Sequence, residues 1–252
     1  MALEFLSLQG ATHLARNVEG GALILRELGN QTALKLSIES ESYDRKETKS
    51  GKRQKVLDVP KSRGVNLEIM MDEQQREDVA LAFQAEMNKT QAGAVSDEAL
   101  SATLKVGDEI KLDGFNLTAV SLTDSTATTP VTAEIGTHYS VDEDYGTITI
   151  LDLTGLTQPL KASYTSGETE STVLFSLPDN AEYYLLFKGI NSINDKRLAL
   201  ELWRFKPEIQ GEMDFINEET GEISIKGSAL ADTTKTNDPK LGGFGRIVYL
   251  DL

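Results

Sequence analysis

Strand-like segments follow one another in KRLALELWRFKPEIQGEMDFINEETGEISIKGSALAD, which comprises residues Lys196–Asp232. Within Pro207–Phe215, acidic and amide side chains alternate with Ile209 and other apolar residues, and this period of two places successive side chains on opposite faces of a strand. Ile223 and Ile225 alternate with polar residues in the same way. The segment therefore predicts antiparallel strands with one buried face and one wet, negatively charged face.

The strand that precedes Pro207 is apolar on both of its faces. Leu198, Leu200 and Leu202 occupy one face, and Ala199, Trp203 and Phe205 occupy the other. Two apolar faces indicate a second contact, either within the chain or between subunits.

A second pair of alternating segments lies near the N-terminus. Leu34–Ile38 and Val65–Ile69 each alternate apolar with polar residues, as half-buried strands do. They predict a long antiparallel hairpin whose tip is a basic loop, about residues 45–63. A connection of this length between paired strands is unusual and is typical of functional or disordered segments.

A single helix is predicted after this hairpin, over about residues 72–89. Asp72 is expected to cap its first turn, with Gln75 at the reciprocal capping-box position. The helical spacing of apolar residues predicts one stripe that packs on a sheet face. That stripe consists of Val79, Ala82, Phe83 and Met87.

Changes in amino-acid composition divide the chain into three parts. Residues 1–101 are expected to form the first part of a β-sandwich, 102–168 an inserted small β module rich in Ser and Thr, and 169–252 the remaining strands. Residues 92–101 are small and polar and are interpreted as a linker. Asp142, Asp144 and Gly146 imitate the opening of a calcium loop, but an acidic β-turn explains the same residues, and the glutamate of a calcium loop is missing.

The charge of the chain limits the classes of function that it can have. The formal net charge of −15 argues against ordinary nucleic-acid binding, because Lys and Arg supply most of the affinity for phosphates. Residues 45–63 nevertheless hold eight cations and two anions, so this segment carries +6 and the remainder −21. Opposite charges on one chain favour contact between copies, whereas the alternative is a solvated, mobile loop.

No catalytic constellation stands out. His13 and His138, the only two histidines, are each flanked by Thr, and Gly242–Gly245 lacks the Lys-Ser/Thr of a phosphate loop. The chain has no Cys, and neither a metal nor a cofactor is expected. No leader pattern and no membrane-spanning apolar run are evident, so we expect a soluble protein made in the cytoplasm that is not an enzyme.

Several of these features together resemble the tail tube (major tail) protein of long-tailed bacteriophages. They are Leu28-Gly29-Asn30, the strand pair around Ser50-Gly51, the capped helix, Lys196–Phe205, and Gly221–Ala231 with its Gly-Ser-Ala-Leu-Ala-Asp ending. The resemblance covers roughly the first 90 and the last 80 residues. HYSVDEDYGTITIL and PLKASYTSGE in the middle resemble the β insertion that some members carry.

The resemblance implies an antiparallel β-sandwich or barrel that assembles into hexameric rings. Such rings stack into a hollow tube in the virion, and DNA passes through the tube at ejection without specific binding. Tail terminator, tape measure and baseplate or tip proteins would be its partners. A single chain has too few strands to enclose a duplex, so the pore has to be shared between subunits, and acidic walls would keep DNA from adhering.

Two groups of residues are assigned roles on this basis. The candidates for the channel wall are Ser37, Glu39, Glu41, Asn66, Glu68, Glu208, Gln210, Glu212, Asp214 and Glu222. The candidates for stacking one ring on the next are Arg45, Lys46, Lys49, Lys52, Arg53, Lys55, Lys61 and Arg63. The module 102–168 is expected on the tube exterior.

Two other functions are compatible with the sequence. One is a virion-surface or extracellular β-sandwich that binds a glycan or a receptor through the Thr-rich insertion, which offers few aromatic residues for the purpose. The other is a tube of the type VI secretion kind, whose cargo is protein. A protein that stays monomeric at all concentrations would favour the binding module, and rings or filaments would favour a tube.

Overall fold

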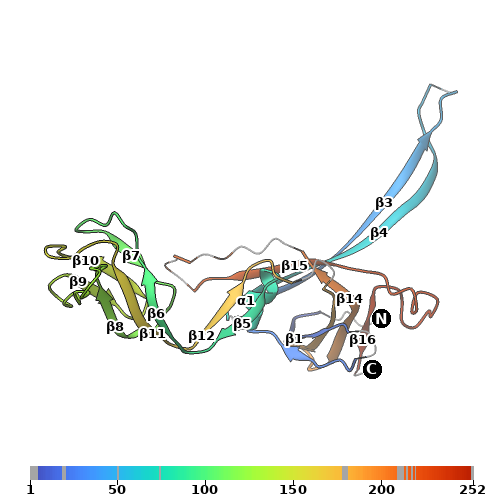
Figure 1. The fold of residues 1–252 in the computed structure, drawn as a ribbon. Coiled ribbons are helices and arrows are strands. Elements are labelled where there is room, and N and C mark those ends of the chain that lie inside the picture. The colour runs from blue at the N-terminus through green and yellow to red at the C-terminus, as the bar shows by residue number, and fades with distance from the viewer. Residues whose placement is uncertain are drawn as a thin grey trace. The chain divides into compact units, whose positions relative to one another are not determined.

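The chain is described by a computed structural model that covers residues 5–18, 21–49, 51–73, 75–177, 181–208, 213, 215–216, 218 and 220–250 (Figure 1). The fold is mainly β with antiparallel sheets, as the sequence predicts. It divides into two compact units: unit 1 comprises Met1–Glu86 and Thr172–Leu252, and unit 2 comprises Met87–Ser171.

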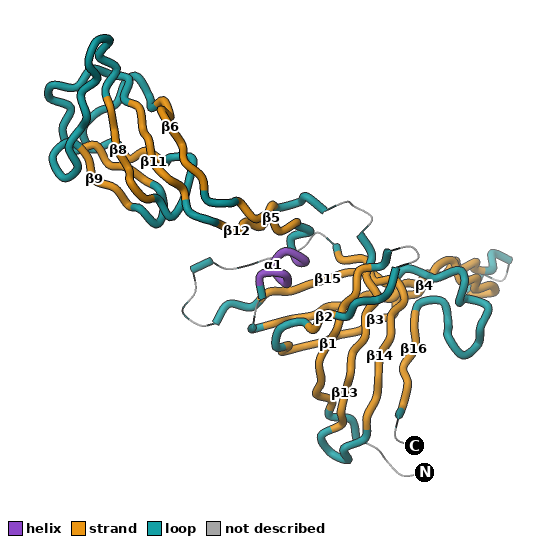
Figure 2. Tube along the Cα trace, turned by 60° about the horizontal axis from the view of Figure 1, so that its bottom comes forward, coloured by secondary structure: helices purple, strands orange, loops and turns teal. Residues whose placement is uncertain are grey.

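Unit 1 contains one eight-stranded sheet and the helix α1. Its elements are β1 (Leu8–Arg16), β2 (Arg26–Glu27), β3 (Gln31–Lys46), β4 (Lys55–Met71), α1 (Arg76–Ala82), β13 (Tyr183–Asn191), β14 (Arg197–Pro207), β15 (Ile223–Ala229) and β16 (Gly245–Tyr249). The strand order is β2-β1-β13-β14-β15-β4-β3, and β16 also pairs with β14. Figure 2 shows β16 beside β14.

The sheet branches at β14, and the branches enclose the core of unit 1. One edge of β14 pairs with β16 through Leu198–Leu202 and with β15 through Phe205–Pro207. The buried cluster joins apolar side chains from both branches and from α1, including Leu67, Ile69 and Leu81. Burial of this apolar surface is the main stabilising contribution in unit 1.

The long hairpin of β3 and β4 confirms the prediction for this segment. Leu34 pairs with Ile69, and Ile38 pairs with Val65, so the alternating apolar residues share one face. The predicted loop 45–63 is wrong in extent, because pairing continues outward to Lys46 and Lys55 and leaves residues 47–54 as the connection. Cross-strand pairing extends the ribbon although the side chains of its outer residues are exposed to solvent.

The faces of β14 do not follow simple alternation. The register with β13 shifts between the pairs Leu185–Leu202 and Tyr183–Phe205, so a β-bulge interrupts the period. Phe205 consequently belongs to the same core cluster as Leu202, which corrects the prediction that it shares a face with Trp203. The Trp203 indole donates a hydrogen bond to the Gly242 carbonyl at 3.0 Å.

Helix α1 begins later and ends earlier than the predicted 72–89. Its N-cap is Gln75, not Asp72, and the Gln75 N–H donates to Asp78 Oδ2 at 3.3 Å. Gln84 has a positive φ of 46°, and the Ala85 N–H donates to the Ala80 carbonyl at 2.7 Å. This Schellman-type ending stops the helix. Met87 therefore lies in a strand and is exposed instead of extending the apolar stripe.

Unit 2 closes a core of its own. Its strands are β6 (Gly93–Ala99), β7 (Glu109–Lys111), β8 (Thr118–Thr123), β9 (Tyr139–Asp142), β10 (Thr147–Ile150) and β11 (Lys161–Ser166). They form the sheets β7-β10-β9 and β6-β11-β8, which bury Leu122, Ile148 and Ala162 completely. β5 (Glu86–Thr90) pairs with β12 (Thr169–Val173) where the chain enters and leaves the unit.

The borders of unit 2 are wider than the module 102–168 inferred from the sequence. Residues 92–101 are not a linker, because β6 pairs with β11 there in spite of its small, polar composition.

The acidic stretch Pro207–Phe215 of unit 1 is described only in part. Pro207 ends β14, and Met213 forms an isolated β-bridge with Ile223. Ile209–Glu212 and Asp214 lie outside the described residues.

Candidate assembly surfaces

A polar face covers the side of β3, β4 and β15 that is turned away from the core. Register places Lys35, Glu68 and Lys226 in one row across the three strands. Each lysine Nζ lies 3.3 Å from a Glu68 carboxylate oxygen. Hydrogen bonds from Lys35 and Lys226 hold the pKa of Glu68 below its usual range. Glu68 is therefore ionised but flanked by two cations.

Several predicted channel-wall residues share this polar face. Ser37 pairs with Asn66 two positions from the Glu68 row, and Glu41 pairs with Ser62, whose hydroxyl donates to the Glu41 carboxylate at 3.4 Å. Glu39 alternates in phase with Ser37 and Glu41. Glu208 and Glu222 are exposed just outside β14 and β15, whereas Gln210, Glu212 and Asp214 lie outside the described residues.

From residues 39 and 64 outward to the tip, β3 and β4 have no neighbouring strand among the described residues except each other. β15 pairs with β4 only between Val65 and Met71, so residues 39–64 form a two-stranded ribbon, which we call the arm (Figure 1). Almost all of its described residues are exposed. An isolated two-stranded hairpin is marginally stable in water, and both of its edges are open to pairing.

The two faces of the arm differ in character. Tyr43 pairs with Val59, and their side chains and that of Leu57 are 43–50 % exposed. Lys61 Nζ lies 5.7 Å from the centre of the Tyr43 ring. On the other face Lys55 Nζ contacts Asp44 at 2.6 Å and Asp58 at 2.9 Å. One face is therefore an apolar strip edged with cations, and the other is ion-paired.

All eight predicted stacking residues lie in the arm, but most are in strands and not in a loop. Arg45 and Lys46 belong to β3, and Lys55, Lys61 and Arg63 belong to β4. Lys49, Lys52 and Arg53 lie in the connection. All eight residues are exposed, which leaves their charges at the surface.

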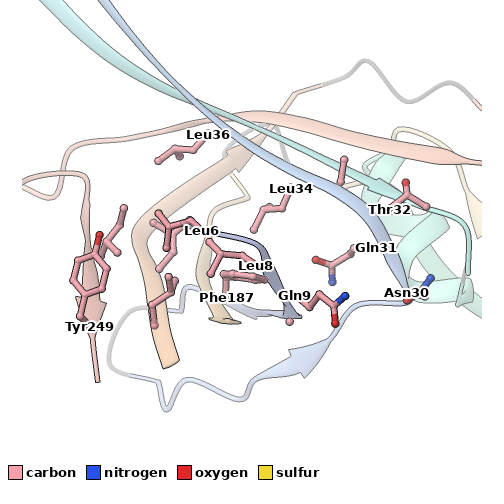
Figure 3. A pocket seen from close by; sticks show the side chains of 15 residues that line it. Leu6, Leu8, Gln9, Asn30, Gln31, Thr32, Leu34, Leu36, Phe187 and Tyr249 are labelled. Carbon is pink, nitrogen blue, oxygen red and sulfur yellow. The ribbon is translucent and has the colours of Figure 1, made fainter. Parts of the chain in front are cut away.

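An apolar groove of about 650 Å³ opens between β3 and the layer formed by β1, β13, β14 and β16 (Figure 3). Its large apolar side chains are Leu6, Leu8, Leu34, Leu36, Phe187, Leu198, Leu200, Ile247 and Tyr249. Its polar lining is uncharged: Gln9, Asn30, Gln31 and Thr32.

The strands that flank the groove each have a free edge. Within the described chain, β16 pairs only with β14, and β3 pairs only with β4. Sequence reasoning missed this groove: it expected a second contact on the strand of Leu198 and Leu200 but gave Leu6, Leu8, Ile247 and Tyr249 no part in it.

Unit 2 holds a buried carboxylate that organises its loops. Asp124 is 2 % exposed and accepts hydrogen bonds from the Thr126 hydroxyl and from the N–H groups of Val131 and Thr157. These bonds, first that from Thr126, lower the pKa of Asp124 to about 2. The bonds join three loop segments, so the carboxylate has a structural role.

The two histidines have different polar neighbours. His13 Nε2 lies 3.2 Å from Lys188 Nζ and 3.6 Å from a Glu27 oxygen, and His138 Nδ1 accepts the Glu134 N–H at 3.0 Å. In the described part of the chain, no three His, Cys, Asp or Glu side chains are grouped so that they could hold a metal ion. Among the same residues, no helix is long and apolar enough to cross a membrane.

Comparisons with known proteins place the chain in a family. No curated protein matches the sequence significantly. The family model described as "Protein of unknown function UCP028589" matches residues 5–248, which is nearly the whole chain. The protein therefore belongs to this family.

Proposed function

We propose that the protein is a structural subunit whose copies form hexameric rings that stack into a hollow tube, as the tail tube protein of long-tailed phages does. The observation that carries this proposal is the arm. A ribbon with two free edges, an exposed Tyr43–Leu57–Val59 strip and eight cations gains little stability in an isolated molecule. It is stabilised when a second copy covers it.

Charge supports a second copy as the partner of the arm. Unit 1 holds 21 Lys and Arg against 27 Asp and Glu, a net charge of −6. Residues 45–63 contribute +6, so the rest of unit 1 carries −12. Opposite potentials on one chain attract copies to each other, and the attraction weakens with salt. We assign the arm to the contact between stacked rings.

The channel wall is the polar face of β3, β4 and β15 in this proposal. An eight-stranded sheet is too small to surround a duplex, so strands from several copies have to share the wall. Glu39 and Glu41, at the end of the arm that joins the sheet, supply negative charge to this wall, whereas Glu68 is offset by Lys35 and Lys226. Such a wall repels phosphates weakly and offers few cations to retain them. Unit 2, with its own core, is assigned to the exterior.

Charge reversal in the arm tests the proposal. We expect the triple variant Lys52→Glu, Arg53→Glu and Lys55→Glu to remain folded but to form no stacked tubes in negative-stain images. The matched control, Lys105→Glu, Lys161→Glu and Lys240→Glu, changes the net charge equally outside the arm and should assemble as the wild type does. Tubes of unchanged length from the arm variant would contradict the assignment.

A further inference from the structure

The end of unit 1 that holds α1 is acidic. Residues 72–86, which follow Met71, have five acidic side chains and one arginine, a charge of −4. Residues 208–222, which lead to Ile223, have six acidic side chains and no Lys or Arg, a charge of −6. Ile223 pairs with Met71, so both segments adjoin one end of β4, and we call them the acidic end. Their charge of −10 is most of the −12 that unit 1 carries outside residues 45–63.

An exposed apolar strip lies beside α1 at this end. Three consecutive side chains, which we call the receiving strip, are 44–62 % exposed: Val173, Leu174 and Phe175. The Phe175 N–H donates to the Phe83 carbonyl, just past α1, and the Glu86 N–H donates to Ser176 Oγ at 2.6 Å. Phe175 has a positive φ of 55°. A bulky residue that is held in this conformation and exposed to water is unusual, and such strained residues cluster at functional sites.

The arm is complementary to the acidic end in both apolar surface and charge. Its own apolar strip is 43–50 % exposed. Arg45 pairs with Leu57 of that strip, and Lys61 Nζ lies over the Tyr43 ring, so cations border it. Glu86 borders the receiving strip. An apolar centre with opposite charges at its rim is typical of a specific interface.

The arm cannot reach the acidic end of its own molecule. Val59 and Met71 are twelve residues apart in β4, which separates them by about 40 Å. The acidic end follows Met71, whereas pairing with β3 extends the arm the other way, to Lys55. Figure 1 shows the tip of the β3–β4 ribbon at the end away from α1. An arm that covers the receiving strip therefore belongs to a different copy.

We infer that the arm of one copy packs its apolar strip on Val173–Phe175 of the next copy, with Arg45 and Lys61 beside carboxylates of the acidic end. This inference rests on the proposed function, because it names the surface that receives the arm when rings stack. The charges of +6 on residues 45–63 and −10 on the acidic end favour this pairing. Because the two surfaces lie at opposite ends of one strand, the contact is head to tail, and its repetition builds a stack.

Thiol cross-linking tests the contact, since the chain has no cysteine of its own. Two single variants, Leu57→Cys in the arm and Leu174→Cys in the receiving strip, are mixed, allowed to assemble and treated with a short bis-maleimide. We expect mass spectrometry to find peptides that join position 57 to position 174. Ile193→Cys, which is similarly accessible at 59 % exposure, replaces Leu174→Cys in the control and should give only background links.

Exchange of charges provides the second measurement. Arg45→Glu with Lys61→Glu, or Glu77→Lys with Glu86→Lys, should each raise the protein concentration needed for stacking about tenfold or more, because like charges then meet. The four substitutions together should recover most of this loss, because opposite charges meet again. All four side chains are exposed, so the variants should fold and keep the Trp203 emission of the wild type.

The outcomes separate this contact from the proposed function. Tubes that form without the link between positions 57 and 174, or a fourfold variant that stacks no better than either pair, would overturn the inference and leave the proposed function standing. Absence of any self-association in the wild type would overturn both.

Discussion

Asp78 is the residue on which the packing of α1 most depends. Its carboxylate is fully buried, and Arg26 Nη1 approaches one of its oxygens to 2.5 Å. The N–H groups of Gly29 and Gln75 donate to the other oxygen at 3.0 and 3.3 Å. One side chain therefore caps the helix, fixes the turn before β3 and neutralises Arg26.

Replacing Asp78 should destabilise unit 1 strongly. Asp78→Ala leaves one cation and two backbone N–H groups without their acceptor, and we expect the free energy of unfolding to fall by about 3 kcal/mol. Urea denaturation followed by the fluorescence of Trp203, the one tryptophan, measures this change. Glu77→Ala, an exposed neighbour in the same turn, is the control and should lose only a few tenths of a kcal/mol. Equal losses in the two variants would refute this role.

The lowered pKa of Asp124 predicts that unit 2 loses stability in acid. Its folded pKa of about 2 lies below the ordinary value of 3.8, so its stabilising contribution is present above pH 4 and is lost as the pH falls toward 2. Asp124→Asn removes this titration. Heat denaturation by circular dichroism should therefore show a larger loss of stability between pH 4.5 and pH 2.5 in the wild type than in the variant. Parallel pH profiles would count against the linkage.

At the scale of elements, the junction of β14 and β15 requires a glycine. A Cβ on Gly227 would lie 2.3 Å from the Lys206 carbonyl and 2.7 Å from the Phe205 ring. Gly227→Ala should push β15 away from β14 and lower the free energy of unfolding by about 2 kcal/mol, measured by urea denaturation. Gly64→Ala in β4 is the matched control, because its nearest neighbour would be 4.0 Å away. If both glycines tolerate alanine equally, the close approach is not required.

The strands that could be predicted from the sequence are those whose side chains alternate regularly between buried and exposed. The apolar alternation in Leu34–Ile38 and Val65–Ile69 identified the hairpin and its buried face, because one face of each strand lies on the core. The outer arm escaped prediction, since backbone pairing without burial leaves no periodic pattern. The end of α1 escaped for another reason: Gln84 adopts a positive φ, a conformation for which glycine is the usual signal.

The candidate surfaces were predictable only in part. The excess of Lys and Arg over residues 45–63 identified the cations of the arm. The alternation of side chains along each strand placed Ser37, Glu41 and Asn66 on one face. Neither the lysine neighbours of Glu68 nor the groove could be found this way, because both depend on which strands lie next to each other. Strand order arises from long-range pairing, to which local alternation is insensitive.

At the scale of the whole molecule, unit 2 should be dispensable for assembly. It encloses its own core, and β5 and β12 pair where the chain enters and leaves it. Replacing residues 91–168 with a short Gly-Ser linker should leave unit 1 folded, with the Trp203 emission of the wild type, and still able to form tubes. Loss of the tubes with unit 1 intact would show that unit 2 takes part in the assembly contacts.

The most direct test of the account is electron cryomicroscopy of the purified wild-type protein over a range of concentrations. We predict six-fold rings that stack into a tube, with Ser37, Glu39 and Asn66 facing the bore and each arm crossing to the adjacent ring. A protein that remains a single globule at every concentration, or a tube whose bore is lined by cations, would contradict assembly into an acid-lined tube.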